Sequence, residues 1–170
     1  NTGIAQMGAI GFLLQNSPTI GAALDVLIRH CDSIAPGWDF KLQVEGDEGT
    51  LTVTETLPMA PLRGFAHEVT LATLDNQTRA LHGPGSLPIR RIEVPFPPPP
   101  HASEYGSFFH DVPVSFDRPV AKVVFDSALL QAKVRFADPA TLQLAEKFCA
   151  ELILLDSPEG GLVSQVRRLL

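Results

Sequence analysis

Histidines are the side chains of this chain best suited to acid–base or metal chemistry, and their spacing favours neither. The five are His30, His67, His82, His101 and His110. No two are four residues apart, the spacing that places two imidazoles on one helical face to bind a metal ion. A small enzyme with His67, His101 or His110 as general base is one alternative. However, neither adjacent carboxylate forms an evident acid–base pair with its histidine, because Glu68 points away from His67 on the same helix and Asp111 lies with His110 in an expected turn. Motifs such as GxSxG, HExxH, CxxC and the P-loop are absent, so we predict no catalytic residues, no cofactor and no metal site.

A second group of residues fits the binding of a small molecule. Arg63 and His67 lie one turn apart in an expected helix, and aromatic side chains elsewhere in the chain supply apolar walls. A cation and an imidazole among aromatics suit a carboxylate with an apolar tail, such as an amino-acid derivative or a fatty acid. We predict an effector site made by Trp38, Arg63, His67, Tyr105, Phe108 and Phe109.

The helix that carries Arg63 and His67 is expected to run from Pro61 to His82, where Gly83 and the next proline end it. Its apolar residues cover more than half of its circumference, so we expect it to contact two surfaces.

Alternating apolar and polar residues predict most of the strands. The pattern runs from Trp38 to Val44, stops at the turn GDEG and resumes at Leu51, which is typical of an antiparallel hairpin. Two further alternating runs flank the proline segment 97–100, which no helix or inner strand tolerates. After it, Tyr105, Phe108 and Phe109 fall at i, i+3 and i+4 and predict a short aromatic helix.

Proline just after a capping residue marks three other helix starts. Ser17 and Pro18 begin a helix that ends at Pro36-Gly37, and Asp138-Pro139 begins one that ends at Asp156. A third start at Ser157 opens a final helix towards Leu170. Together these patterns predict an α+β fold with two layers, an antiparallel sheet covered by helices, with strands near Phe40, Ile92, Val114 and Val123. A jelly roll is the alternative architecture.

Composition narrows the function further. The chain has 170 residues, 13 basic and 19 acidic side chains, and a formal charge of −6, which disfavours DNA binding by this segment. Cys31 and Cys149 lie on apolar helix stripes and are expected to be buried free thiols, as in a reducing cytoplasm. No apolar run is long enough to cross a membrane, so we predict a cytoplasmic protein with no membrane partner.

Several segments in this order resemble the amino-terminal effector-binding domain of AraC-type transcription regulators, the arabinose-binding-like subclass. They are GAIGFLLQNSPTIGAALDVLIRHCDSIAPG, KLQVEGDEGTLTVTE, HASEYGSFFHDVPVSFDRPVAKVVFDSALL and ADPATLQLAE, and the likeness covers about Gly8 to Leu170. Members of this family commonly have a glycine and a small residue where this chain has His110, Asp111 and Val112.

The resemblance implies a ligand-sensing and dimerising domain that controls an attached DNA-binding module. Residues 1–156 would form the regulatory domain, and residues 157–170 would begin a linker helix towards a helix-turn-helix domain that this sequence lacks. The chain starts without methionine and ends inside an amphipathic pattern, so we expect an excised domain. We expect a small-molecule effector and a homodimer formed through the helix that ends at Asp156. A pure dimerisation module without a ligand is the alternative.

Overall fold

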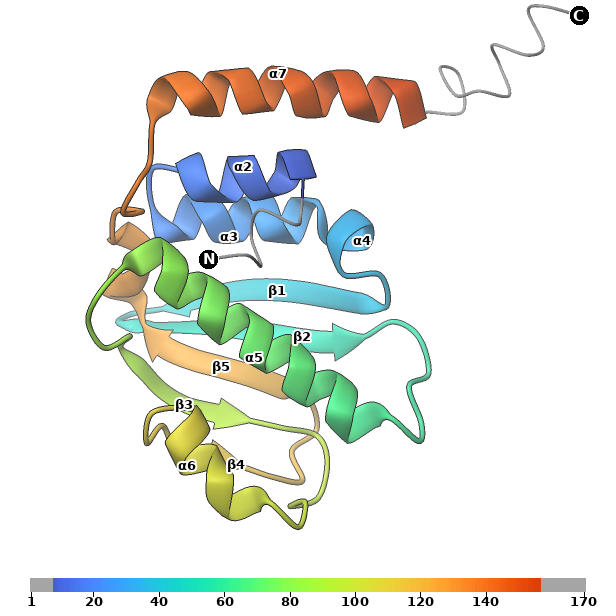
Figure 1. Ribbon diagram of the computed structural model, residues 1–170. Coiled ribbons are helices and arrows are strands. Elements are labelled where there is room, and N and C mark those ends of the chain that lie inside the picture. Colours follow the sequence, from blue (N-terminus) through green and yellow to red (C-terminus); the bar gives the residue numbers. More distant parts are fainter. Residues whose placement is uncertain (1–7, 157–170) are drawn as a thin grey trace, which may run out of the picture.

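The computed structural model describes residues 8–156, and the side chains of residues 8–147. One sheet has the strand order β1-β2-β5-β3-β4, and helices cover one of its faces (Figure 1). The strands are β1 (Trp38–Glu45), β2 (Glu48–Glu55), β3 (Ile89–Glu93), β4 (Val114–Ser115) and β5 (Ala121–Asp126). The helices are α2 (Gly8–Asn16), α3 (Ile20–Arg29), α4 (Cys31–Ile34), α5 (Arg63–His82), α6 (Tyr105–Phe108) and α7 (Pro139–Asp156), with 3-10 turns at Ala102–Glu104 and Ser127–Gln131. This architecture confirms the predicted α+β class.

Strands β1 and β2 form the predicted hairpin. Phe40 lies opposite Val53 and Leu42 opposite Leu51, so the apolar residues of both strands share one face. Gly46 in the turn has a φ of 60°, a conformation that glycine adopts without a steric penalty.

Strand β4 corrects the predicted sheet, which was antiparallel throughout. It runs parallel to β3, with Ile92 opposite Val114. Parallel neighbours need a crossover connection, and residues 94–113, which include the proline segment and α6, provide it. The sheet is therefore antiparallel in four strands and mixed at one edge.

The two faces of the sheet differ in chemistry. The helix-covered face carries buried apolar side chains such as Leu51, Val53 and Phe125, whereas the other carries Lys41, Thr50, Thr52, Lys122 and Glu93. Such alternation is what the sequence pattern predicted, because one face of an antiparallel sheet tolerates water.

Helices α3 and α5 lie over the apolar face, and α2 and α7 form further layers beyond α3 (Figure 1). The main core joins α2 and α3 to β1, β2 and β5. A smaller core joins α5 to β3 and α6 through Leu71, Ile92, Val94, Tyr105 and Phe109. Helix α5 thus contacts both cores.

The first predicted helix start is wrong by two residues. Thr19, and not Ser17, is the N-cap of α3, and its side chain accepts a hydrogen bond of 3.2 Å from the backbone of Ala22. Ser17 instead donates to the carbonyl of Leu13 at the end of α2. The helix also breaks at His30, so its expected continuation to Pro36 becomes the separate turn α4.

The other helix boundaries agree more closely. Helix α5 begins at Arg63, two residues after the expected Pro61, and ends at His82 with Gly83 at a φ of 92°. Asp138 accepts a hydrogen bond of 2.9 Å from the backbone of Thr141 and caps α7 as predicted. Within the described residues no helix is long and apolar enough to cross a membrane.

The short aromatic helix is present, but its three aromatic residues do not share one environment. Tyr105 and Phe109 are buried, whereas Phe108 is 50% exposed.

Cys31 is buried and unbonded to another cysteine, and its thiol donates to the carbonyl of Trp38 at 3.0 Å. The side chain of Cys149 and the helix expected from Ser157 lie outside the described residues.

Candidate functional site

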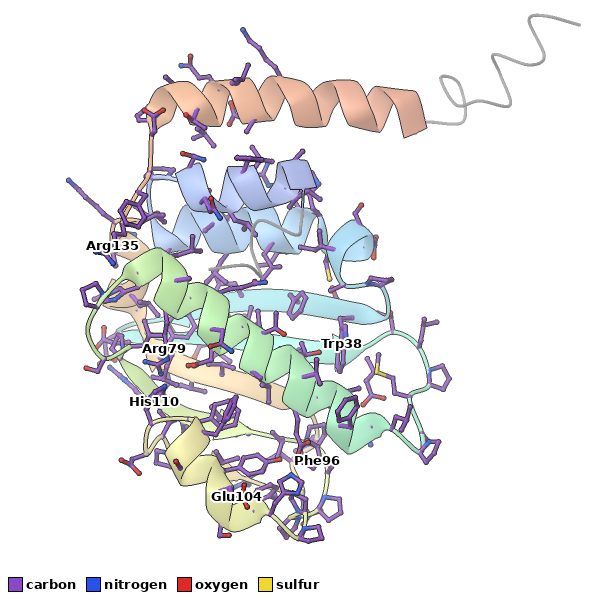
Figure 2. The ribbon with its side chains drawn as sticks, in the orientation of Figure 1. Trp38, Arg79, Phe96, Glu104, His110 and Arg135 are labelled. Carbon is purple, nitrogen blue, oxygen red and sulfur yellow. The ribbon has the colours of Figure 1, made fainter. Side chains whose placement is uncertain are left out.

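Chemically active side chains gather on both sides of the amino-terminal half of α5. Figure 2 shows Trp38 and Glu104 on opposite sides of this helix. Trp38 belongs to a closed group on the sheet side, which we call the Glu55 cluster. Glu104 belongs to an open groove between α5 and α6.

The Glu55 cluster joins the end of β2 to the first turns of α5. One carboxylate oxygen of Glu55 accepts hydrogen bonds from Nε of Arg63 and from Nε2 of His67, the latter at 2.8 Å. The His67 ring is 1% exposed and packs edge-on against Trp38, with ring centroids 4.8 Å apart. Phe96 lies 6.0 Å from the same imidazole. The cluster therefore fixes α5 to the sheet through one carboxylate and two aromatic contacts.

Burial and charge set the protonation of this cluster. Burial lowers the pKa of His67, and the nearby Glu55 carboxylate only partly offsets it. Burial acts to raise the pKa of Glu55, but the hydrogen bonds from Arg63 and His67 outweigh it and lower that pKa. Glu55 is therefore ionised and His67 neutral near pH 7, with its proton on Nε2. The other ring nitrogen, Nδ1, is buried and has no hydrogen-bond partner among the described residues.

On the other side, α5 and α6 enclose an open groove of about 620 Å³. We call it the α5–α6 groove, and its lining residues are Phe65, Glu68, Val69, Ala72, His101, Glu104, Tyr105, Ser107, Phe108 and Phe109. Phe65 is 65% exposed, and Val69 and Phe108 are about half exposed. A concave, largely apolar surface with a few polar groups is the usual form of a small-molecule site.

Glu68 is the polar group of the groove that accepts two side-chain hydrogen bonds. Its Oε1 accepts hydrogen bonds from the Tyr105 hydroxyl and from Nε2 of His101, the latter at 2.9 Å. The Tyr105 and His101 rings stack with centroids 6.0 Å apart. Burial, and to a lesser extent the hydrogen bond to the Glu68 carboxylate, raises the pKa of the Tyr105 hydroxyl. The hydroxyl therefore stays protonated and donates the hydrogen bond.

The structure divides the six predicted site residues between the two sides of α5. Tyr105, Phe108 and Phe109 line the groove. Trp38, Arg63 and His67 belong to the Glu55 cluster, so the two groups do not converge on one point. Sequence reasoning missed Glu55 and Glu68. The spacing of Phe65, Glu68 and Ala72 at i, i+3 and i+7 puts them on one face of the helix, and this signal could have identified Glu68.

Two smaller spaces also border α5. A cavity of about 50 Å³ lies beneath it, lined mainly by apolar residues that include Leu51, Leu71 and Val123. A second groove of about 310 Å³ separates α5 from α3, α4 and β1, with Trp38 and Thr73 in its walls. Among the residues whose side chains are described, no group of three histidine, cysteine or acidic residues is placed to hold a metal ion.

A helix-covered sheet with an open, largely apolar groove is an arrangement that suits the binding of another molecule. Comparisons with known proteins show the family to which this domain belongs. Residues 1–134 match the family described as the arabinose-binding domain of AraC transcription regulators, N-terminal. The chain belongs to this family, as its motifs predicted.

Two proteins of Pseudomonas aeruginosa illustrate the likeness. The chain is 28% identical to an ornithine utilization regulator over 169 residues, which are 98% of this chain and 49% of that protein. It is similar in fold to the crystal structure of the transcriptional regulator CdpR, with a TM-score of 0.66, 20% identity, and coverage of 84% of this chain and 46% of the other. The chain spans about half the length of each of these two proteins.

Proposed function

We propose that this domain senses a small-molecule effector in the α5–α6 groove and passes the bound state to a DNA-binding module of the same regulator. The observation that carries the proposal is the groove itself, a space of about 620 Å³ on a domain of the AraC regulator family. Ligand pockets commonly measure about 300–1,000 Å³, so the groove has room for a metabolite.

The position of the groove supports a role in switching. One wall is α5, which also contacts the sheet and both cores, and the other wall is α6. A ligand that binds one arrangement of these helices better than another shifts their equilibrium, and regulators need a coupling of only about 1–3 kcal/mol. Helix α5 is suited to this because only His67, Leu71 and Leu81 of its residues are buried.

The sequence favoured a carboxylate effector that meets Arg63 and His67. Glu55 already supplies a carboxylate to both side chains from within the chain. An effector carboxylate would have to displace it and leave a charged group unpaired, which is costly at a half-buried position. We therefore propose the groove, and not the Glu55 cluster, as the effector site.

The remaining parts of the proposal concern the whole regulator. DNA reading belongs to the part of the protein beyond this chain, because the net charge of −6 opposes binding to phosphates. We propose a homodimer formed through α7, whose described outer residues include Leu144 at 55% exposure. Such a regulator acts in the cytoplasm, where its DNA lies.

The test is a thermal-shift screen of the 170-residue chain with amines, carboxylic acids, amino acids and sugars. Ser107→Trp fills the groove, and Ser103→Trp is the matched control because Ser103 is exposed and is not among the groove's lining residues. We expect some compound to stabilise the parent and the control but not the filled variant. A ligand that stabilises all three equally would place the site elsewhere, and the absence of sequence-specific DNA binding by the full-length regulator would overturn the proposal.

A further inference from the structure

We propose that the α5–α6 groove binds an organic cation, an ammonium group carried on an apolar body. This inference rests on the proposed function of the groove and adds the chemical class of its ligand. The charges around the groove carry it. The lining residues include two carboxylates, Glu68 and Glu104, and no lysine or arginine.

The arginines of α5 do not neutralise these carboxylates. Arg63 bonds Glu55 on the other side of the helix, and Arg79 forms a bidentate pair with Asp75 at 2.8 and 2.9 Å. Within the described residues, Oε2 of Glu68 and both carboxylate oxygens of Glu104 accept no hydrogen bond from the protein. Since His101 contacts Glu68, the carboxylate of Glu104 has no basic partner among the described side chains. A carboxylate ligand is repelled by this arrangement, and a cation is attracted.

Glu68 is positioned for this role before any ligand arrives. The Tyr105 hydroxyl and the His101 ring hold its Oε1, while its side chain is 27% exposed. A half-buried carboxylate interacts with a cation more strongly than a fully solvated one, because less water screens the pair. Two donors fix Oε1, so Oε2 is already oriented when an ammonium group binds. Little side-chain entropy is therefore lost in ordering the Glu68 carboxylate.

Aromatic rings complete a surface that suits a cation with an apolar body. Phe65 and Phe108 expose much of their rings to the groove, and Tyr105 lies behind Glu68. Ammonium groups are attracted to ring faces within about 6 Å, and the attraction adds to that of a carboxylate. Val69 and Ala72 supply aliphatic contact on α5 for the rest of the molecule.

The decisive experiment compares ligands that are similar in their apolar part and differ in charge. Phenethylamine, 2-phenylethanol and 3-phenylpropanoate share a phenyl ring and a short chain but are cationic, neutral and anionic. Titration calorimetry with the 170-residue chain should show the amine binding about tenfold or more tightly than the alcohol, and the carboxylate more weakly than either. High salt should reduce the advantage of the amine, because screening weakens the charge interaction.

Variants test whether these carboxylates are responsible. Glu68→Gln keeps an acceptor for Tyr105 and Glu104→Gln keeps the shape of an exposed side chain, and each should remove most of the amine's advantage over the alcohol. Glu146→Gln makes the same change of charge on α7, away from the groove, and should leave the advantage intact. Equal effects of all three variants would mean a general field effect and would overturn the proposal.

The outcomes also separate this inference from the proposed function. If the alcohol or the carboxylate binds the groove as tightly as the amine, and Ser107→Trp abolishes that binding, the groove is an effector site but the cation proposal fails. If none of the three compounds nor any compound of the screen binds, both fail. If the Phe65–Phe108 surface instead mediates self-association, sedimentation will show a dimer that Phe108→Ala dissociates, and the groove is an interface.

Discussion

The two sides of helix α5 carry similar residue types, but the carboxylate on each side has different partners. On the sheet side, Glu55 meets Arg63 and His67, so its charge is balanced inside the fold. On the groove side, Glu68 meets only a tyrosine and a histidine, and aromatic rings stay exposed next to it. The contrast teaches that acidic residues beside aromatics differ in what the fold supplies to them, because Glu55 has an arginine partner and Glu68 does not.

Breaking the closed side should have the largest effect. Glu55→Ala leaves the buried His67 ring without its acceptor and the half-exposed Arg63 without its ion-pair partner. We expect the free energy of unfolding to fall by about 2–3 kcal/mol, most of it from His67. Urea unfolding followed by circular dichroism measures this. Glu45→Ala, at the exposed end of β1, is the matched control and should leave the urea midpoint unchanged. A loss as small as in the control would mean that the cluster is not a structural pair.

Lowering the pH should weaken the same side by protonation. The pKa values of His67 and Glu55 are both lowered in the folded protein, so the unfolded chain binds more protons than the folded one as pH falls. Stability should therefore decline first below about pH 6.5 as unfolded His67 takes up a proton, and further below about pH 4.5 as Glu55 does. Urea midpoints across this range test the sign, and His67→Gln should flatten the first decline.

On the groove side, the same kind of truncation should cost less stability. Tyr105→Phe removes the hydroxyl that donates to Glu68, at a position where that carboxylate stays partly hydrated. We expect a loss of about 1 kcal/mol in the free energy of unfolding, together with weaker ligand binding because Glu68 is no longer held. Phe116→Leu, which trims an aromatic packed against the same tyrosine, is the control for packing and should spare the charge selectivity. A larger loss from Tyr105→Phe than from Glu55→Ala would reverse the comparison.

The smallest effect is expected at the end of α6, where the backbone is strained. His110 and Asp111 have φ values of 56° and 63°, a region that favours glycine, and Figure 2 shows His110 beside this turn. His110→Gly should raise the free energy of unfolding by about 0.5–1 kcal/mol, because glycine adopts this φ without a Cβ clash. His110→Ala removes the same side chain but keeps Cβ, so it should give no gain. Equal changes in the two variants would show that the side chain, and not the backbone, decides stability here.

Local patterns in the sequence predicted most of the fold correctly. Alternation gave the β1–β2 hairpin and β5, and glycine and proline gave the ends of α5 and the start of α7. These signals work because strand faces and helix ends depend on neighbouring residues. The start of α3 was missed because Ser17 and Thr19 are both good caps, and contacts between α2 and the following turn chose between them.

The candidate site was predicted only in part, for a related reason. Helical spacing identified Tyr105, Phe108 and Phe109 together, and all three line the groove. Nothing in their spacing indicated that Glu68, far earlier in the chain, would accept the Tyr105 hydroxyl. The same limit applies to Glu55, whose partners lie on the next element of the fold.

The sequence by itself therefore determined most of the elements, though not α2 or the separate turn α4, together with the polar and apolar faces of the sheet and the family. Only the tertiary structure decided that β4 runs parallel to β3 and that Glu55 satisfies Arg63 and His67. It also decided that no lysine or arginine lines the groove beside its carboxylates. The physical reason is that secondary structure depends on contacts a few residues apart, whereas the balance of a charge depends on which distant segments pack against it.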